Sequence, residues 1–188
     1  NILRGFAYLI AGGVAIKVNN DAFYKFGNSY VLGIPIPVIV FAVIGVILAI
    51  ILERTVFGRH MVAVGGNIEA ARYAGINIKK VKIIGYMVSG SLAALAGVIV
   101  ASRVYSGQPT AGQGFESDAI ASAVLGGTSF NGGRGSIGGT IIGILIIAIV
   151  ANGLNLLEVP YYWQTVVKGL VIMLAVYYDT EKQRRTVG

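Results

Sequence analysis

The chain has 188 residues, of which 55% are hydrophobic and only 12% are charged, against about 25% charged residues in a typical soluble domain. This composition excludes a disordered chain, a collagen and an ordinary soluble enzyme, and it indicates a protein that crosses a membrane several times. The net charge is +7, and the absence of cysteine together with a single histidine excludes a disulfide scaffold, a zinc finger, a thiol nucleophile and a multi-histidine metal site.

Six apolar stretches follow one another along the chain. A membrane span needs roughly 20 apolar residues, and four stretches approach that length: Ile34–Leu52, Ile83–Ser102, Ser136–Leu154 and Pro160–Tyr178. Gly5–Val18 reads as the end of another span. Ala119–Gly127 is too short to cross and is interpreted as a broken helix, which a membrane tolerates only when it is packed within protein. The sequence therefore predicts an all-α, polytopic transmembrane bundle of about six membrane elements, forming a single domain over residues 1–188.

The distribution of Lys and Arg predicts which loops are cytoplasmic, because such loops carry an excess of basic residues. The loop 53–82 is the most basic segment, and we expect it to be cytoplasmic together with the C-terminal tail, which carries Lys182, Arg184 and Arg185. The outer loops hold only Lys17, Lys25 and Arg103. We therefore attribute the net positive charge to the orientation of the chain in the membrane and to attraction to anionic lipid, and we expect no nucleic-acid partner.

Small residues recur at every fourth position in two of the predicted spans. They are Gly85, Ser89, Ala93, Gly97 and Ala101 in one, and Gly135, Gly139 and Gly143 in or beside the other, where the row continues past Ile147 to Ala151 and Asn155. Lipid provides no hydrophobic drive for helix association, so close backbone approach must provide it. These stripes predict a compact multi-helix bundle.

The loop 53–82 contains a short helix with both ends marked. Asn67 is a favourable N-cap residue and Gly75 a favourable residue after the C-terminus, which predicts a helix over Ile68–Ala74. Gly65 and Gly66 are expected to turn the chain before it, and Asn77 is expected to cap the following span.

This predicted helix needs a partner surface. Two turns are too few for an isolated helix in water, although Glu69 in the first turn favours the helix dipole and can pair with Arg72. The small centre Ala70-Ala71 would suit insertion into a groove.

At these residues the sequence resembles a known family. Glu69-Ala70-Ala71 followed by Gly75 resembles the EAA-type loop of ABC importer permeases. The string FGRHMVAVGGNIEAARYAGI is similar to the monosaccharide-transporting branch, the ribose, xylose, arabinose and galactose permeases. So are GQPTAGQGFESDAIASAVLGGTSFNGGRGSIGGT, NGLNLL and VKGLVIMLAV. The resemblance covers nearly the whole chain and is most specific over residues 57–178. It implies that the chain corresponds to the C-terminal three-fifths of a longer permease.

The resemblance implies a transport mechanism in a bacterial inner membrane. A permease homodimer would sit on two cytoplasmic ABC ATPase subunits, and an extracytoplasmic sugar-binding protein would deliver a ribose-like monosaccharide. The short helix would couple the permease to the ATPases, with these expected coupling residues: Gly65, Gly66, Asn67, Glu69, Ala70, Ala71, Arg72 and Gly75. The permease itself would carry no catalytic residue, metal or cofactor.

Other functions compete with this interpretation. Nucleoside and branched-chain amino-acid permeases are close relatives, and the stretches QPTAG and NGLNLL favour the sugar branch. An ion-coupled secondary transporter would be expected to carry acidic residues inside its spans, where only Asp118 comes close. A membrane-embedded enzyme would need a cluster of nucleophile, base or metal ligands, and the sequence shows none.

A few polar residues in or beside the spans are candidates for the translocation path. An intramembrane charge costs at least about 2.5–3.5 kcal/mol on insertion scales, so Lys168 should have a partner, and Asp118 and Glu116 are the nearest plausible carboxylates. We predict that Lys168 pairs with Asp118 and holds the broken helix. The other candidates are Gln108, Asn152 and Asn155, whose amides would suit a sugar but would equally suit packing bonds between helices.

Overall fold

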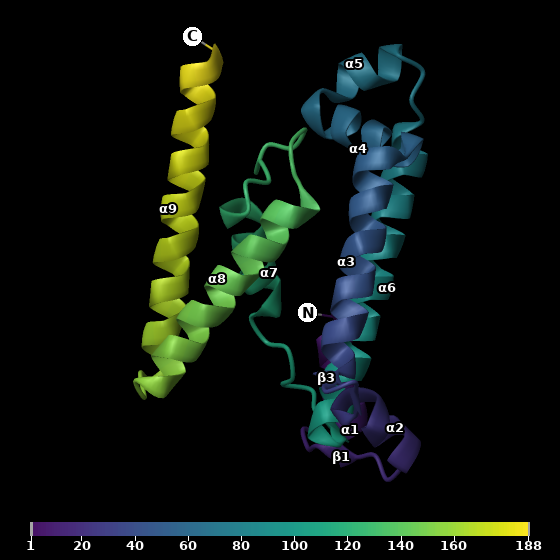
Figure 1. Ribbon diagram of the computed structural model, residues 1–188, viewed down its shortest axis with the longest axis vertical. Coiled ribbons are helices and arrows are strands. Elements are labelled where there is room, and N and C mark those ends of the chain that lie inside the picture. Colours follow the sequence, from purple (N-terminus) through teal and green to yellow (C-terminus); the bar gives the residue numbers. More distant parts are fainter. Residues whose placement is uncertain (1, 188) are drawn as a thin grey trace. The chain divides into compact units, whose positions relative to one another are not determined.

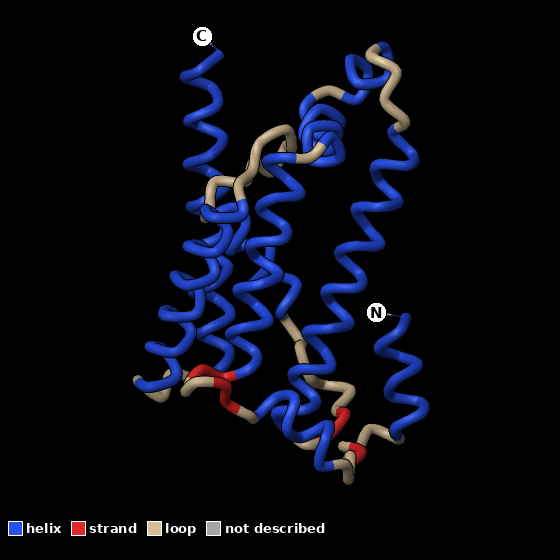
Figure 2. The backbone as a smooth tube through the Cα atoms, turned by 45° about the vertical axis from the view of Figure 1, so that its right-hand side comes forward, coloured by secondary structure: helices blue, strands red, loops and turns tan. Residues whose placement is uncertain are grey.

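The computed structural model describes residues 2–187, with the side chains of that range except those of residues 161, 172, 175 and 178–187. The described residues fold mostly into helices (Figure 1). In chain order the elements are α1 (Ile2–Ala11), β1 (Ile16–Lys17), α2 (Asp21–Asn28), β2 (Tyr30–Val31), β3 (Ile34–Pro35), α3 (Ile36–Arg54), α4 (Val56–Gly66), α5 (Ile68–Tyr73), α6 (Ile78–Val104), β4 (Ser106–Gly107), α7 (Phe115–Leu125), α8 (Ile137–Leu156) and α9 (Tyr161–Val187). The strands are two-residue pieces beside loops, as Figure 2 shows. The predicted all-α fold class is confirmed.

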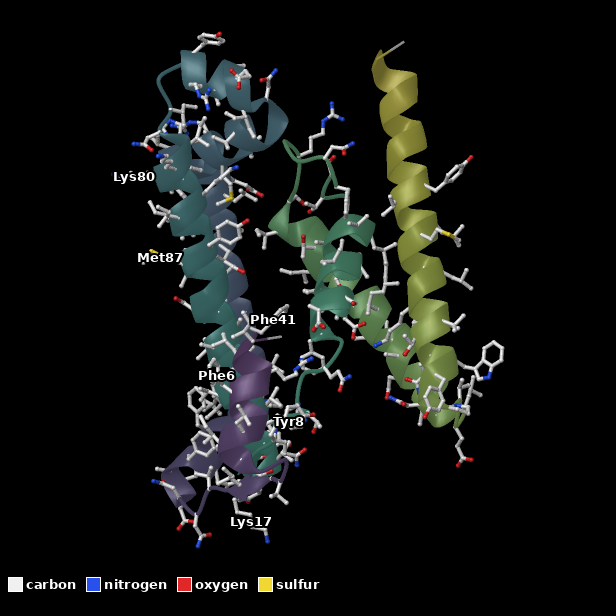
Figure 3. The ribbon with its side chains drawn as sticks, turned by 180° about the vertical axis from the view of Figure 1, so that it is seen from behind. Phe6, Tyr8, Lys17, Phe41, Lys80 and Met87 are labelled. Atoms are coloured by element: carbon white, nitrogen blue, oxygen red, sulfur yellow. The ribbon has the colours of Figure 1, made fainter. Side chains whose placement is uncertain are left out.

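Three described helices, α3, α6 and α8, are long and apolar enough to cross a membrane. They correspond to three of the four full-length predicted spans. Polar side chains cap the N-termini of α6 and α8. The Lys80 N–H donates to Asn77 Oδ1 at 3.0 Å, and the Gly139 N–H donates to Ser136 Oγ at 2.9 Å. The expected cap at Asn77 is thereby confirmed. Apolar side chains such as Phe6 on α1 and Met87 on α6 project from their helices, 58% and 65% exposed (Figure 3), as lipid-facing residues do.

Apart from Pro160, the fourth predicted span lies within α9, which begins at Tyr161 and runs on to Val187. The side chains of the basic tail, Lys182, Arg184 and Arg185, lie outside the described residues. That this helix crosses the membrane and that its C-terminus is cytoplasmic stay predictions.

The start of the chain differs from the prediction. The first helix ends at Ala11, and Gly12 and Gly13 follow with φ of +61° and +76°, a left-handed conformation that glycine adopts without strain. The chain turns there and enters β1, so the extension of an apolar span to Val18 was wrong. Likewise Pro35 lies in β3, paired with β2, and the third helix begins at Ile36.

Packing divides the chain into two compact units. One runs to Ile44 and resumes at Ile84–Gln113, and the other comprises Gly45–Ile83 and the chain from Gly114 onward. Helices α3 and α6 therefore contribute residues to both units.

In the first unit, hydrogen bonds join α2 to the C-terminal end of α6. Ser102, fully buried, donates through Oγ to the Phe23 carbonyl, and Asn28 Nδ2 donates to the Ser102 carbonyl at 3.1 Å. A Cβ built on Gly27 would lie 2.6 Å from Ser102 Oγ, so only glycine allows this close approach. Beside it β1 pairs antiparallel with β4, matching Ile16 to Gly107.

An aromatic pair adjoins this contact. The rings of Tyr24 and Tyr105 stack with centroids 4.0 Å apart and an interplanar angle of 18°, and Tyr105 has a φ of +57°. Desolvation and the neighbouring Tyr24 phenol raise the pKa of Tyr105 to about 12. A non-glycine residue at positive φ is strained, and the stacked ring helps to offset that strain.

In the second unit, α7 and α8 pack against each other (Figure 1), and glycines lie at their closest contact. A Cβ on Gly143 would collide with the Ser122 carbonyl, and one on Gly139 with the Gly126 carbonyl. The crossing buries Ala121, Ser122 and Val124. This confirms the close packing predicted for the stripe in α8. The stripe in α6 behaves differently in the described chain, because a Cβ on Gly97 would meet nothing within 4 Å.

Candidate functional site

The short helix predicted in the loop 53–82 is present as α5. The Ala70 N–H donates to Asn67 Oδ1 at 2.9 Å, which caps the first turn. The helix ends at Tyr73, and Gly75 follows with a φ of +77°. The Ile76 N–H then donates to the Ala71 carbonyl at 3.0 Å, so the chain leaves through a glycine-based C-terminal turn. The predicted caps are confirmed, and the helix is one residue shorter than expected.

A second helix, α4, was not predicted. Gly65 and Gly66, expected to turn the chain, are instead its last residues. The turn occurs at Asn67, which ends α4 in an extended conformation (φ −153°, ψ 109°) and caps α5 with its side chain. A usable signal was present, since Thr55 is a favourable N-cap residue and its Oγ1 accepts from the Gly58 N–H at 3.2 Å.

A small core fixes α5 against α4 and the start of α6. Val64, Ala71 and Val81 are 6%, 3% and 7% exposed, with Phe57, Ile76 and Ile78 packed around them. Burial of this apolar surface stabilises a helix that is too short to persist alone. We call this arrangement the α4–α5 pair. Its consequence is that Ala71 faces its own protein, so the expectation that Ala70 and Ala71 both enter a partner's groove was wrong for Ala71.

The opposite face of α5 is open. The side chains of Glu69 and Arg72 are each 65% exposed and lie 3.6 Å apart, which confirms the predicted pair. Ala70 is also exposed. The apolar residue Tyr73, which was not predicted as part of the site, joins this face at 87% exposed. Ile68, three residues before Ala71, is 42% exposed. Tyrosine and arginine are enriched among the residues that carry most of the binding energy of protein interfaces.

The second candidate feature is the ion pair predicted in the membrane region. Lys168 Nζ on α9 lies 2.8 Å from Asp118 Oδ2 on α7, and the two side chains are 25% and 28% exposed. The pairing is confirmed. The broken helix predicted at Ala119–Gly127 is α7, which begins earlier, at Phe115, so that Asp118 lies in its first turn. The other plausible partner, Glu116, is exposed.

The remaining path candidates make local contacts. Gln108 Nε2 donates to Ser106 Oγ at 3.3 Å beside β4. Asn155 Oδ1 accepts from Gln164 Nε2 at 2.9 Å, and that amide also donates to the Val159 carbonyl at 2.9 Å. Asn155 thus closes the turn between α8 and α9, which is a packing role. Asn152 is exposed on α8. A role of these amides in a path stays a prediction.

Comparison with known proteins gives one family and a set of close relatives. The family model described as "Branched-chain amino acid transport system / permease component" matches residues 2–176. The chain is 49% identical to the ribose import permease protein RbsC of Bacillus subtilis over 183 residues, covering 96% of this chain and 57% of that protein. It is 48% identical to the xylose transport system permease protein XylH of Haemophilus influenzae, covering 96% and 45%. It is 42% identical to the L-arabinose transport system permease protein AraH of Escherichia coli, covering 99% and 57%.

The chain therefore spans little more than half the length of the ribose and arabinose relatives. No solved structure matches it with comparable significance.

Proposed function

Because this chain belongs to the branched-chain amino acid transport system / permease component family, we propose that it forms part of the membrane permease of an ATP-driven importer. The proposed substrate is a ribose-like monosaccharide, because the relatives described above are named for ribose, xylose and L-arabinose. The proposed role is passage of the sugar, with ATP hydrolysis in a separate subunit.

The single observation that carries this proposal is the presentation of α5. A two-turn helix is held by an internal core on one side, while the other side displays Tyr73 together with the Glu69–Arg72 pair. A rigid helix face whose shape exists before binding loses little conformational entropy on docking. Such a helix suits a groove on a cytoplasmic ATPase subunit, and displacement of α5 would move α4 with it because they share the core.

The proposal extends to partners and location. The apolar helices α3, α6 and α8 support a membrane location. We propose a bacterial inner membrane, with residues 53–82 and the C-terminus cytoplasmic, because the loop 53–82 is rich in Lys and Arg. The proposed partners are two ABC ATPase subunits, an extracytoplasmic sugar-binding protein and a second permease copy.

The Asp118–Lys168 pair has a proposed positioning role. The pair joins α7 to α9 at 2.8 Å, so each charge satisfies the other in a region where an unpaired charge is costly. We propose that this ion pair holds the short helix α7 in the bundle beside the translocation path, and that it does not couple transport to protons or cations.

The test uses the full-length permease with its ATPase and binding protein in liposomes. Ala70→Arg places a long charged side chain on the exposed face of α5, and it should abolish sugar-stimulated ATP hydrolysis while the permease stays folded. Ala70→Ser, which keeps a small side chain, should retain the stimulation. Hydrolysis unchanged by Ala70→Arg would remove the coupling role.

Two further measurements separate the alternatives. Copurification of a stoichiometric ATPase from native membranes, lost in Ala70→Arg, supports the importer; uptake driven by an ion gradient without ATP would support a secondary transporter. Uptake of ribose measured against a nucleoside and leucine distinguishes the sugar permease from the other permeases of this class.

A further inference from the structure

The end of α4 touches the turn between α7 and α8 through backbone alone. A Cβ built on Gly65 would lie 2.7 Å from the Gly133 nitrogen, and one built on Gly133 would lie 2.7 Å from the Gly66 Cα. A Cβ on Gly132 would lie 2.5 Å from the Gly65 carbonyl oxygen. Real Cβ atoms essentially never come closer than 3.0 Å to another heavy atom in this way, so no side chain fits between the segments. We call Gly65, Gly66, Gly132 and Gly133 the glycine joint.

The loop side of the joint has a second requirement for glycine. Gly132 and Gly133 have φ values of +88° and +76°, the left-handed region that residues with a Cβ rarely adopt. The helix side has no such requirement, because Gly65 lies in the last turn of α4. Substitution of Gly65 therefore changes the contact without straining its own backbone.

The joint is tied by backbone bonds to α7. Across the turn, the Ser129 N–H donates to the Arg134 carbonyl at 3.0 Å. At the end of α7, the Thr128 N–H donates to the Ala123 carbonyl at 3.0 Å, and the Gly127 N–H donates to the Val124 carbonyl at 2.9 Å. The turn is thus an extension of α7, the helix that carries Asp118.

The joint is also tied to α5. Val64, the residue before Gly65, is 6% exposed in the core that buries Ala71 of α5. A continuous set of contacts therefore runs from the exposed face of α5 through the core and the joint to α7. It continues through the Asp118–Lys168 pair to α9.

We propose that the glycine joint positions α7 during transport, so that displacement of α5 by the ATPases reaches the short membrane helix by direct backbone contact. This inference rests on the proposed function. A contact made of backbone has no side-chain torsions that could absorb a displacement, whereas a contact between long side chains has several. Gly65 and Gly133 are thus positioning residues, and they bind neither ATP nor sugar.

The test compares a glycine of the joint, Gly65, with a glycine outside it, Gly138 on α8. Alanine forms helix better than glycine by about 1 kcal/mol, so Gly65→Ala does not weaken α4 itself. It places a methyl group against the backbone of Gly133 and disrupts the joint. In the reconstituted full-length importer, the sugar moved per ATP hydrolysed should fall about tenfold or more, within the range of an ordinary coupling free energy. Gly138→Ala, whose Cβ would meet nothing within 4 Å, should keep the ratio.

The outcomes separate a positioning role from a folding role. An unchanged ratio in Gly65→Ala overturns the proposal. So does a parallel loss of assembled complex, hydrolysis and transport, because a residue needed only for folding lowers all three together. Stimulated hydrolysis that survives Ala70→Arg would overturn the coupling role proposed for α5, on which this inference rests. Abolition by Ala70→Arg with a normal ratio in Gly65→Ala would overturn the joint alone.

A measurement on the unaltered importer decides the matter independently of any variant. Amide hydrogen exchange is compared with and without a non-hydrolysable ATP analogue on the assembled complex. Protection of residues 65–67 and of residues 132–134 should change together. A change confined to residues 65–67 would show that displacement stops at α4 and would contradict the proposal.

Discussion

Lys168 and Asp118 form an ion pair at 2.8 Å between two helices that are separated by a third in the sequence. Each side chain is about a quarter exposed, at 25% and 28%, so neither charge is fully solvated. The pair links the short helix α7 to α9, and α7 is also packed at glycines against α8.

Removing one charge of this pair should destabilise the fold. Lys168→Met leaves the Asp118 carboxylate without its partner, and Asp118→Asn leaves the ammonium without its own; each should cost about 1–3 kcal/mol. The double variant Lys168→Met/Asp118→Asn should recover part of that loss, because no uncompensated charge is left. Thermal unfolding in detergent measures the stability and liposome uptake measures the function. Single variants that fold and transport normally would leave the pair without a holding role.

Removing the α5 cap should loosen that helix alone. Asn67→Ala deletes the acceptor of the Ala70 N–H and should destabilise the helix by about 1 kcal/mol. Faster amide exchange is expected in Ile68–Tyr73, together with weaker binding to the ATPase. Asn77→Ala removes the equivalent cap at the start of α6 and serves as the control, because a 27-residue helix tolerates a frayed first turn. Equal effects of the two variants would contradict the special dependence of α5 on its cap.

Filling the crossing of α7 and α8 should separate these helices. Gly143→Ala drives a methyl group into the Ser122 carbonyl, and overpacking of this kind typically costs about 1–3 kcal/mol. Gly90→Ala, where a Cβ meets nothing within 4 Å, should fold as the natural chain does. The comparison is made by thermal unfolding. A normal melting temperature for Gly143→Ala would show that the crossing can widen at little cost.

Deleting the Ser102 hydroxyl should release α2 from α6. This buried hydroxyl donates to the Phe23 carbonyl, and losing a partner of a buried polar group costs about 1–3 kcal/mol. Ser102→Ala should therefore speed amide exchange in Asp21–Asn28. Ser91→Ala is the matched control, because Ser91 donates at 2.8 Å to Met87 of its own exposed helix face. Protection of α2 that does not change would show that Asn28 alone suffices to hold it.

The parts of the site that sequence could predict are those with local signals. Asn67 and Gly75 mark the ends of α5 because caps depend on neighbouring residues alone. The partner of Lys168 was predictable because a membrane charge requires one. Asp118 was predicted as that partner from the sequence, and the structure confirms it. Glu116 does not share the role, because residues two apart on a helix point to different faces.

The parts that could not be predicted depend on distant contacts. Gly65 and Gly66 carry the pattern of a turn, yet they end a helix, and the reason for glycine lies in Gly132 and Gly133, far along the chain. Nothing in the local sequence indicates that these two pairs of glycines are in contact. Which face of α5 is buried could not be predicted either, because Ala70 and Ala71 have the same side chain. Only the core around Val64 and Val81 distinguishes them.

The backbone contacts between Gly65 and Gly133 and between Gly126 and Gly139 also limit how damage at these positions could be repaired genetically. A defect from a larger side chain in an ordinary core is often suppressed by a second mutation that shrinks the neighbour. Neither member of these pairs has a side chain to shrink. Genetic selection for suppressors of an alanine at Gly65 or Gly139 should therefore return the original codon, or changes elsewhere in the protein, but none in the paired glycine.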